Sequence, residues 1–383
     1  MKRTIAALLA AIVMAGGFLW HCWQVRNWSQ WQAFARVFVQ ADGRVIDRTA
    51  SDRSTSEAQA YALFFALVAN DKPRFENILR WTTNNLAGGD LKANLPAWLW
   101  GAPANGQSEW GIRDSNPASD ADLWLAYTLI EAARLWEQPG YAAIGRGLIE
   151  QVKLREVAQV PGLGLMLLPA PQGFQAEDGS ARLNPSYLPE FQFRWLAMID
   201  PTGPWSLLWK NHLTAMRQLM TKGIAPDWYE VMADGRVVAD RQTKSVSSYD
   251  AIRVPLWAGL TPAVSGRDNE LLALSRPLAA LLSAAESPPE KLDFESGQAS
   301  GGSPIGFSAA VLPFLAAVDE DSAARQRMRL KNSRVEGNLG KPPHYYDQAL
   351  GMFGEGWDFK RFQFDPDGRL IPRWEQSCCE WPF

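Results

Sequence analysis

Apolar residues recur at three- and four-residue spacing along most of the chain, which is typical of helices with one buried face. Between Asp120 and Trp136, for example, Ala126, Leu129 and Ala133 follow this spacing. Loops rich in Gly and Pro separate such stretches from about residue 56 to the C-terminal region. The expected helices are Glu57–Asn70, Pro73–Leu86, Asp120–Trp136, Tyr141–Val157, Trp205–Lys222, Ala251–Leu260, Asn269–Ala285, Ile305–Val318 and Tyr346–Phe353.

Strand signals are sparse by comparison. Asp-Gly turns between apolar runs predict two short β-hairpins, at Val231–Val238 and Phe362–Ile371. No break in composition divides the chain, and the longest low-complexity linker is the Gly/Ser stretch Ser296–Ser303. The sequence therefore predicts an all-α fold with a few short hairpins, built as one domain over residues 22–383.

The N-terminus has the pattern of a targeting segment. Met1-Lys2-Arg3 precedes an unbroken apolar run of 16 residues from Ile5 to Trp20. This pattern predicts a signal peptide over residues 1–21 and a periplasmic or secreted protein. The alternative is an uncleaved N-terminal anchor, for which the run is slightly short. No later stretch is long and apolar enough to span a membrane.

The three cysteines stand at the two ends of the chain, as Cys22, Cys378 and Cys379. An oxidising compartment fits this placement. We expect a disulfide between Cys22 and either Cys378 or Cys379, which would fasten the N-terminal segment to the C-terminal tail. The alternative, an N-terminal anchor with all thiols free, would leave three alkylatable cysteines.

Composition narrows the class of ligand. The formal net charge is -3 with both signs evenly mixed, so the chain lacks the basic stripe that nucleic-acid binding requires. It contains 18 Trp against 8 Tyr and 17 Phe, far more indole than a core of this size requires. We expect many of these rings to face a ligand such as a sugar, whose apolar faces stack on indoles. The alternative is packing between helices.

Several classes of site are poorly supported. Only His21, His212 and His344 are present, which argues against a His-ligated metal or a Ser/His/Asp triad. No Cys-x-x-Cys, Walker or nucleophile-elbow pattern occurs, and Pro161–Gly164 lacks the third glycine of a dinucleotide fingerprint. We therefore expect no metal and no cofactor. Glycoside cleavage is the reaction that needs only a pair of carboxylates.

Three segments place a carboxylate in an apolar or aromatic setting. They are Thr55–Tyr61 with Glu57, Ala118–Trp124 with Asp120 and Asp122, and Ser247–Arg253 with Asp250. Each reads as a helix start, capped by Ser56, Ser119 or Ser248, with the acidic residue in the first turn. The plain alternative is that all of these acids only complement a helix dipole.

Together the three segments resemble the sequence blocks of glycoside hydrolase family 8, and most closely those of endoglucanases from bacterial cellulose-synthase operons. The resemblance runs from about Trp28 to the C-terminus. Its further blocks are Gly43–Asp47, Leu95–Gly101, Asn184–Pro189 and Gly306–Ala310. It implies an (α/α)6 barrel with a substrate cleft across one end, and endo-acting hydrolysis of β-1,4-glucan with inversion at the anomeric carbon.

The resemblance also implies a role for each acid. Glu57 would be the general acid, Asp250 the base that activates water, and Asp120 the residue that holds the distorted sugar ring. Asp122 lies two residues after Asp120, about 200° from it round the helix, so it should point away from the cleft as a structural hydrogen-bond partner. The implied cleft residues are Trp98 as a stacking platform, Tyr187, Tyr249, and Arg253, which would hold Asp250 ionised.

Two departures from the family pattern concern the acid. Ala58 and Ala62 stand where the family usually has glycine, and their methyl groups would narrow the cleft or shift Glu57. Leu125 and Thr128 are milder changes on a buried face. The alternatives that remain open are hydrolysis of xylan or chitosan on the same fold, and a degenerate glycan-binding subunit. A cellulose-synthase complex is the partner that the operon resemblance suggests.

Overall fold

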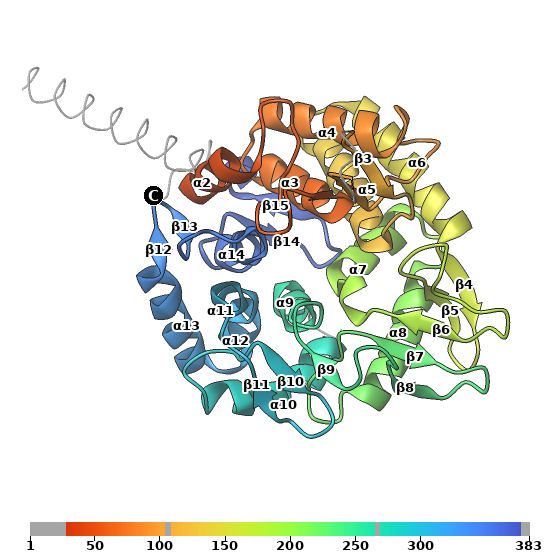
Figure 1. Cartoon of the computed structure of the whole chain (residues 1–383), viewed down its shortest axis with the longest axis vertical. Helices are drawn as coiled ribbons and strands as arrows, with labels where there is room; N and C mark the ends of the chain where they lie inside the picture. The colour runs from red at the N-terminus through yellow and green to blue at the C-terminus, as the bar shows by residue number, and fades with distance from the viewer. Residues whose placement is uncertain (1–27, 104–108, 265–268, 377–383) are drawn as a thin grey trace, which may run out of the picture.

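The computed structural model describes residues 28–103, 109–264 and 269–376, and their helices form two concentric rings (Figure 1). The inner helices are α3 (Ser56–Val68), α5 (Ser119–Leu135), α7 (Glu190–Ile199), α9 (Arg253–Leu260), α11 (Ile305–Ala310) with α12 (Leu312–Val318), and α14 (Tyr345–Asp358). The outer helices are α2 (Ser29–Phe38), α4 (Lys72–Leu86), α6 (Pro139–Arg155), α8 (Trp205–Leu219), α10 (Glu270–Ser283) and α13 (Glu320–Asn332). This is the (α/α)6 barrel that the family resemblance implies.

The burial of each helix agrees with its place in the rings. In α3 every residue except Glu57 is buried, as expected of a helix surrounded by protein on all sides. In the outer helix α13 only Ser322, Ala323, Gln326 and Leu330 are buried, which is a single stripe. The barrel is thus a layer of apolar helices enclosed by a layer of amphipathic ones.

The first and last inner helices, α3 and α14, meet to close the ring. Phe353 of α14 packs against Phe64 and Phe65 of α3, with ring centroids 5.7 and 4.7 Å apart. Outside this seam lies α2, from which Gln30 Nε2 donates a 3.0 Å hydrogen bond to the buried Oε2 of Glu355 in α14. The first described helix therefore completes the outer layer beside the last inner helix.

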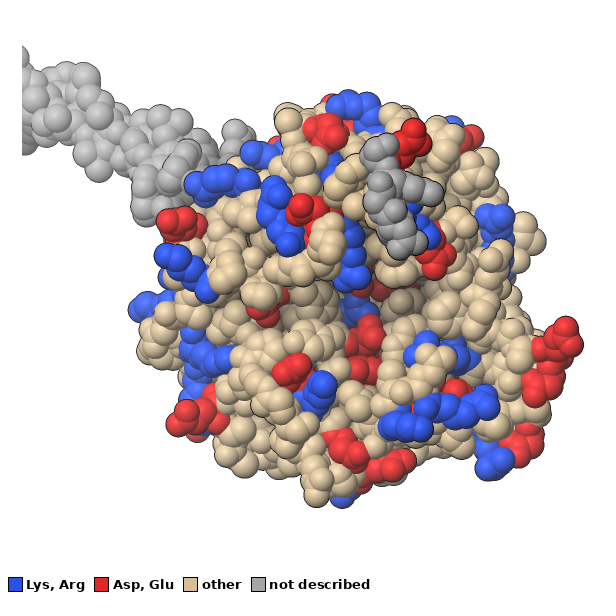
Figure 2. Space-filling view, in the orientation of Figure 1, with Lys and Arg blue, Asp and Glu red and all other residues tan. Residues whose placement is uncertain are grey.

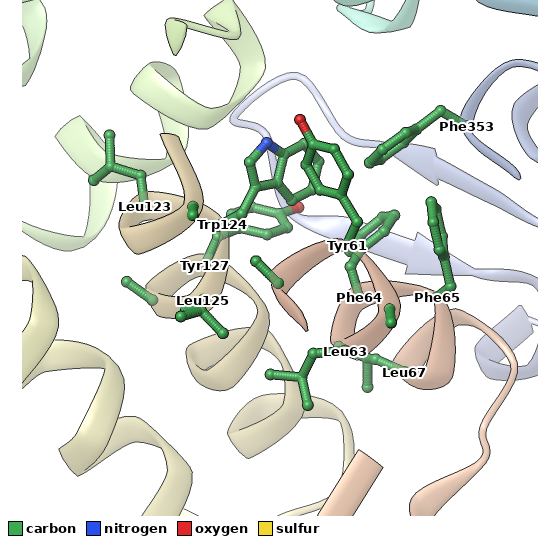
Figure 3. Close-up of a cluster of buried hydrophobic side chains, with 14 of the residues drawn as sticks. Tyr61, Leu63, Phe64, Phe65, Leu67, Leu123, Trp124, Leu125, Tyr127 and Phe353 are labelled. Carbon is green, nitrogen blue, oxygen red and sulfur yellow. The ribbon is translucent and has the colours of Figure 1, made fainter. Parts of the chain in front are cut away.

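Aromatic side chains fill the barrel (Figure 3). Tyr61 and Phe64 meet Trp124 at 5.7 and 5.0 Å between ring centroids, and Trp124 in turn packs on Tyr127 and Phe353. The fully or nearly buried indoles include Trp28, Trp31, Trp81, Trp124, Trp195, Trp205 and Trp257. The expectation that many Trp rings face a ligand is wrong for these residues, because they pack between helices instead.

Short strands lie in the loops around the barrel. They are β1 (Ser54–Thr55), β2 (Leu99–Gly101), β3 (Gly111–Asp114), β4 (Val157–Val160), β5 (Gly164–Leu167), β6 (Ala181–Leu183), β7 (Tyr229–Val231), β8 (Val237–Ala239), β9 (Val246–Ser247), β10 (Lys291–Asp293), β11 (Ala299–Ser300), β12 (Arg334–Val335), β13 (Asn338–Leu339), β14 (Phe362–Phe364) and β15 (Leu370–Pro372). The antiparallel pairs β7–β8 and β14–β15 confirm both predicted hairpins.

The helices differ from the expected ones in two respects. The stretch expected as one helix over 305–318 divides into α11 and α12 at Val311, where Pro313 enters the first turn of α12 and removes a backbone donor. In addition, α2, α7, α13 and the short α15 (Arg373–Gln376) were not among the expected helices.

Some expectations fall on residues whose structure is not described. The leader over residues 1–21 and all three cysteines, Cys22, Cys378 and Cys379, lie outside the described ranges. The signal peptide and the disulfide therefore stay predictions. Within the described ranges, no helix has both the length and the apolar character needed to cross a membrane.

Candidate active site

The predicted site residues meet at one end of the barrel, where the inner helices begin. A cleft of about 480 Å³ opens there, and Figure 2 shows the same face hollowed across its middle, with acidic and basic side chains in the hollow. The residues predicted from the sequence all line this cleft: Glu57, Trp98, Asp120, Tyr187, Tyr249, Asp250 and Arg253. Because helix N-termini carry partial positive charge, this end of the barrel favours carboxylates.

The start of α3 places Glu57 beside Trp98 in the cleft. Thr55 Oγ1 accepts a 3.1 Å hydrogen bond from the Ala58 amide, and the Ser56 amide donates to the Trp98 carbonyl at 3.0 Å. The cap is therefore Thr55, and the expected cap at Ser56 is wrong. The pairing of β1 with β2 fixes this start, because it holds residues 54–55 against residues 99–100.

The other two expected caps are also wrong. Ala118 stands at the N-cap of α5 and makes no side-chain bond, so Ser119 is already inside the helix. Asp250 lies in a turn before α9, whose first residue is Arg253. In that turn the Ile252 amide donates to the Ser248 carbonyl at 3.0 Å, while the side chain of Ser248 bonds elsewhere.

One buried guanidinium joins the carboxyl groups of the site. Arg253 Nη1 contacts Glu57 Oε2, and its Nη2 donates to Asp250 Oδ1 at 2.9 Å. Asp120 Oδ2 lies 3.8 Å from Nη1. Burial by itself would lower the pKa of Arg253, but the surrounding tyrosines and carboxylates hold that pKa well above its ordinary value. Arg253 thus stays charged and fixes Asp250, as the sequence suggested.

Asp120 differs from the other two acids in its surroundings. Its side chain is buried, and burial, followed by the charge of Glu57, raises its pKa to about 8. Oδ1 accepts a 2.7 Å bond from the Ala121 amide, whereas buried Oδ2 has no hydrogen-bond partner among the described residues. Near neutral pH Asp120 therefore carries a proton, which Oδ2 can donate to an acceptor in the cleft.

We expect Asp120→Asn to stabilise the fold at pH 8 relative to the native chain. The raised pKa of Asp120 means that its folded form holds a proton more tightly than the unfolded chain does. The contribution of Asp120 to the free energy of unfolding is therefore complete below about pH 4 and is lost as the pH rises through about 8. The total change in that free energy is up to about 5 kcal/mol. Denaturant unfolding of both proteins at pH 5 and pH 8 measures this change in the free energy of unfolding. The same pH dependence of that free energy in the native chain and in Asp120→Asn would contradict the prediction.

Asp122 has the structural position expected of it. It does not line the cleft but lies fully buried behind it, next to the buried carboxyl group of Glu156. Burial raises the pKa of both groups well above their ordinary values. Asp122 therefore packs α5 against the end of α6 and takes no direct part in the cleft.

The two alanines near the acid are placed away from the substrate. Ala58 and Ala62 are both buried in the core, and neither is among the residues that line the cleft. Their methyl groups fill space between helices. Narrowing of the cleft, which the sequence suggested, therefore finds no support in this arrangement.

The cleft also contains residues that the sequence analysis did not select. They are Asp47, Arg53, Tyr345 and Tyr346. Tyr346 Oη donates a 2.6 Å bond to the carbonyl of Tyr249, so α14 holds the turn before Asp250. The adjacent tyrosines at the start of a predicted helix were a usable signal. Asp47 ends the family block Gly43–Asp47, which was also a usable signal, whereas Arg53 lies in the loop before α3, which no local pattern indicates.

Comparison with known proteins agrees with this geometry. Residues 6–360 match the sequence profile described as glycosyl hydrolases family 8. The chain belongs to this family. Similar family 8 proteins include the endoglucanase of Xanthomonas axonopodis pv. citri, 43% identical over 98% of this chain and 95% of that protein. Another is the endoglucanase of Escherichia coli K12, 42% identical over 92% of this chain and 93% of that protein.

Solved structures of family 8 proteins show the same fold. The endo-1,4-D-glucanase from Vibrio fischeri ES114 is 36% identical and superposes with a TM-score of 0.83, over 91% of this chain and 100% of that one. The endo-β-1,4-glucanase CMCax from Acetobacter xylinum is 23% identical with a TM-score of 0.67, over 85% and 95% of the two chains, and supports the fold alone.

Proposed function

We propose that this family 8 glycoside hydrolase is an endo-β-1,4-glucanase, acting on cellulose or a close relative. The observation that supports it most directly is that Glu57 and Asp250 face one open cleft, held at opposite ends of one guanidinium, with Trp98 beside them. Relatives similar over nearly the whole chain are endoglucanases. The open cleft lets a polymer bind away from its ends, as endo cleavage requires.

The proposed reaction uses two carboxyl groups on opposite sides of the bond. Glu57 protonates the glycosidic oxygen, and Asp250 removes a proton from the water that attacks the anomeric carbon. Neutral Asp120 donates a hydrogen bond to the sugar ring at the point of cleavage, while Trp98 stacks on a neighbouring ring. No step requires a metal or a redox group, since both proton transfers stay on the chain's own carboxyls.

The viscosity of carboxymethyl cellulose tests this function. An endo-acting enzyme lowers viscosity steeply while few reducing ends have formed, and the Glu57→Gln protein should leave viscosity unchanged. Xylan and chitosan are the comparison substrates. Faster cleavage of either would reassign the substrate, and an inactive native protein that still binds glucan would indicate a binding subunit.

The stereochemistry of the product is a separate prediction. An inverting enzyme needs room for a water between its base and the sugar, so the two carboxyl groups should stand about 6.5–9.5 Å apart, against about 5–5.5 Å in a retaining pair. Proton NMR during early hydrolysis should show the α-anomer released from the β-linked chain. Early β-anomer, or a trapped covalent glycosyl-enzyme, would make Asp250 a nucleophile or a bystander.

We also propose that the protein acts outside the cytoplasm, on a glucan that the cell itself exports. The charged start and apolar run at residues 1–20 support export, and the resemblance to endoglucanases of cellulose-synthase operons supports a role in cellulose production. Fractionation of cells tests the first part. For the second, a strain with Glu57→Gln at the native locus should produce cellulose of altered amount or length, and unchanged cellulose would refute the role.

A further inference from the structure

Both oxygens of the base Asp250 are held by donors from the protein. Arg253 Nη2 donates to Oδ1 at 2.9 Å, and the indole Nε1 of Trp228 donates to Oδ2 at 3.0 Å. Two donors on the two oxygens fix the plane of the carboxylate as well as its position. Trp228 stands behind the base, outside the residues that line the cleft.

The ring of Trp228 is itself held in place. The guanidinium of Arg182 lies over it, 4.0 Å from the ring centroid, and Phe174 packs nearly parallel to it at 5.8 Å and 14°. Tyr187 meets it edge-on at 6.2 Å. An indole packed by three side chains has little freedom to turn, so its N–H stays directed at Asp250.

A buried ion pair anchors the guanidinium above the indole. Arg182 donates to the two oxygens of Asp240 at 2.9 and 3.1 Å, and Asp240 is almost fully buried. Burial would raise the pKa of Asp240, but the hydrogen bonds from Arg182 and Thr243 outweigh it and lower that pKa to about 2. The pair therefore stays ionised throughout the pH range in which the enzyme would work.

The residue before Trp228 holds the backbone of the same turn. Asp227 Oδ1 accepts hydrogen bonds from the amides of Ser248 and Ala251 at 2.6 and 2.8 Å, and its Oδ2 accepts from Ser248 Oγ at 2.5 Å. The dipeptide 227–228 thus contacts both the main chain that carries Asp250 and the carboxylate itself.

We infer that Trp228 is a positioning residue for the base, acting through its indole N–H on Asp250 Oδ2. This inference rests on the proposed function, in which Asp250 activates water. With one donor already on each oxygen, the remaining lone pairs of the carboxylate point in fixed directions, and one of them receives the proton of the attacking water. The N–H bond also stabilises the ionised form that a base requires.

The test is the Trp228→Phe variant, which keeps an aromatic ring but removes the donor. We expect kcat to fall about 10–100-fold, the worth of a hydrogen bond to a charged group. KM should change little, because Trp228 does not line the cleft. The low-pH limb of the kcat profile should move up by roughly one pH unit, because the ionised base has lost a donor.

Other groups near Asp250 also influence this pH profile, and they are the same in the native protein and in the variant. The charged and titratable ones are Glu57, Asp120, Tyr187, Asp227, Arg253 and Tyr346.

Trp136→Phe is the matched control. Trp136 Nε1 donates to Asn70 Oδ1 at 2.8 Å near the end of α5, so this variant also loses an indole N–H bond, here to a neutral amide oxygen far from the base. It should keep the native kcat and pH profile. If Trp228→Phe also kept both, the inference would be overturned.

Two further measurements separate this inference from the proposed function. In protein labelled with ¹⁵N-tryptophan, the Trp228 indole resonance, identified by its absence in Trp228→Phe, should titrate with the low-pH limb and cease to do so in Asp250→Asn. A resonance that ignores Asp250 overturns the inference even in an active enzyme. Loss of the proposed function would instead appear as inactivity of the native protein on glucan.

Arg182→Lys provides the answer if Trp228→Phe fails to fold. Lysine keeps the charge opposite Asp240 but has neither the planar stack nor the two-pronged bond. We expect a smaller fall in kcat, about threefold or more, with the low-pH limb displaced in the same direction. A folded Arg182→Lys enzyme with native kcat and pH profile would then count against the positioning role.

Discussion

Glu57→Gln is expected to lower turnover on soluble β-1,4-glucan by at least ~10²–10⁴-fold, the usual loss when a general acid is removed. The amide is close in shape to the carboxyl group but has no proton to give to the leaving oxygen. Glu57 lies at the mouth of the cleft with a partly exposed side chain, so the change should leave the fold nearly intact. Reducing-end assays measure turnover, and thermal unfolding measures the fold.

Asp250→Asn should have a comparable effect for the complementary reason, because the amide cannot accept the proton of the attacking water. Glu150→Gln serves as the control for both substitutions, since Glu150 is exposed on α6 and, among the described residues, forms an ion pair with Lys153 alone. If either site variant retained turnover near that of this control, the role given to its residue would be wrong.

Arg253→Gln should combine a loss of activity with a loss of stability. The guanidinium is 3% exposed and serves Glu57, Asp120 and Asp250 at once, so removing it leaves carboxylates close together without a counter-ion. We expect a loss of roughly 2–4 kcal/mol at pH 7, somewhat less than for a fully buried pair because two of the carboxylates reach solvent. Turnover should fall about 10²-fold or more, as the base loses its orientation.

The pH dependence of the Arg253→Gln effect provides its check. Protonation of the carboxylates removes their mutual repulsion, so the destabilisation should shrink as the pH falls toward 4. Arg217→Gln breaks an exposed pair with Glu270 and should cost little at any pH. If Arg253→Gln cost the same at pH 4 as at pH 7, the loss would come from packing and not from charge.

The site residues that could be predicted from the sequence are those that stand in short contiguous motifs. Glu57, Asp120 and Asp250 each stand in a short block beside small and aromatic residues, and all three lie in the cleft as expected. Their caps were not predictable in the same way. Thr55 caps α3 because β1 pairs with β2, some 45 residues further along the chain. The sequence around Thr55 does not indicate this pairing.

Contacts between distant segments account for the remaining differences. Trp228 lies beside Asp250 because the neighbouring Asp227 bonds to the backbone of residues 246–251, and the pairing of β7 with β6 brings Arg182 over the indole. Among the helices, α13 is so polar that its one buried stripe barely shows, and the start of α7 alternates polar and apolar residues, which conceals the helical period. By contrast α2 has Trp31, Phe34, Ala35 and Phe38 at regular helical spacing, a signal for a helix that the sequence contained and that was overlooked.

Contacts of α2 and α3 with α14 close the ring, and they can form only after α14 has been synthesised. The hydrogen bond from Gln30 to Glu355 spans 325 positions, and the packing of Phe65 on Phe353 is almost as remote in sequence. A nascent chain therefore holds the apolar faces of its first helices uncovered until nearly all of it has been synthesised, and such long-range contacts form slowly. A chain truncated before Tyr345 should aggregate instead of yielding a smaller stable domain, and the full-length chain should need a holding chaperone until its last inner helix is available.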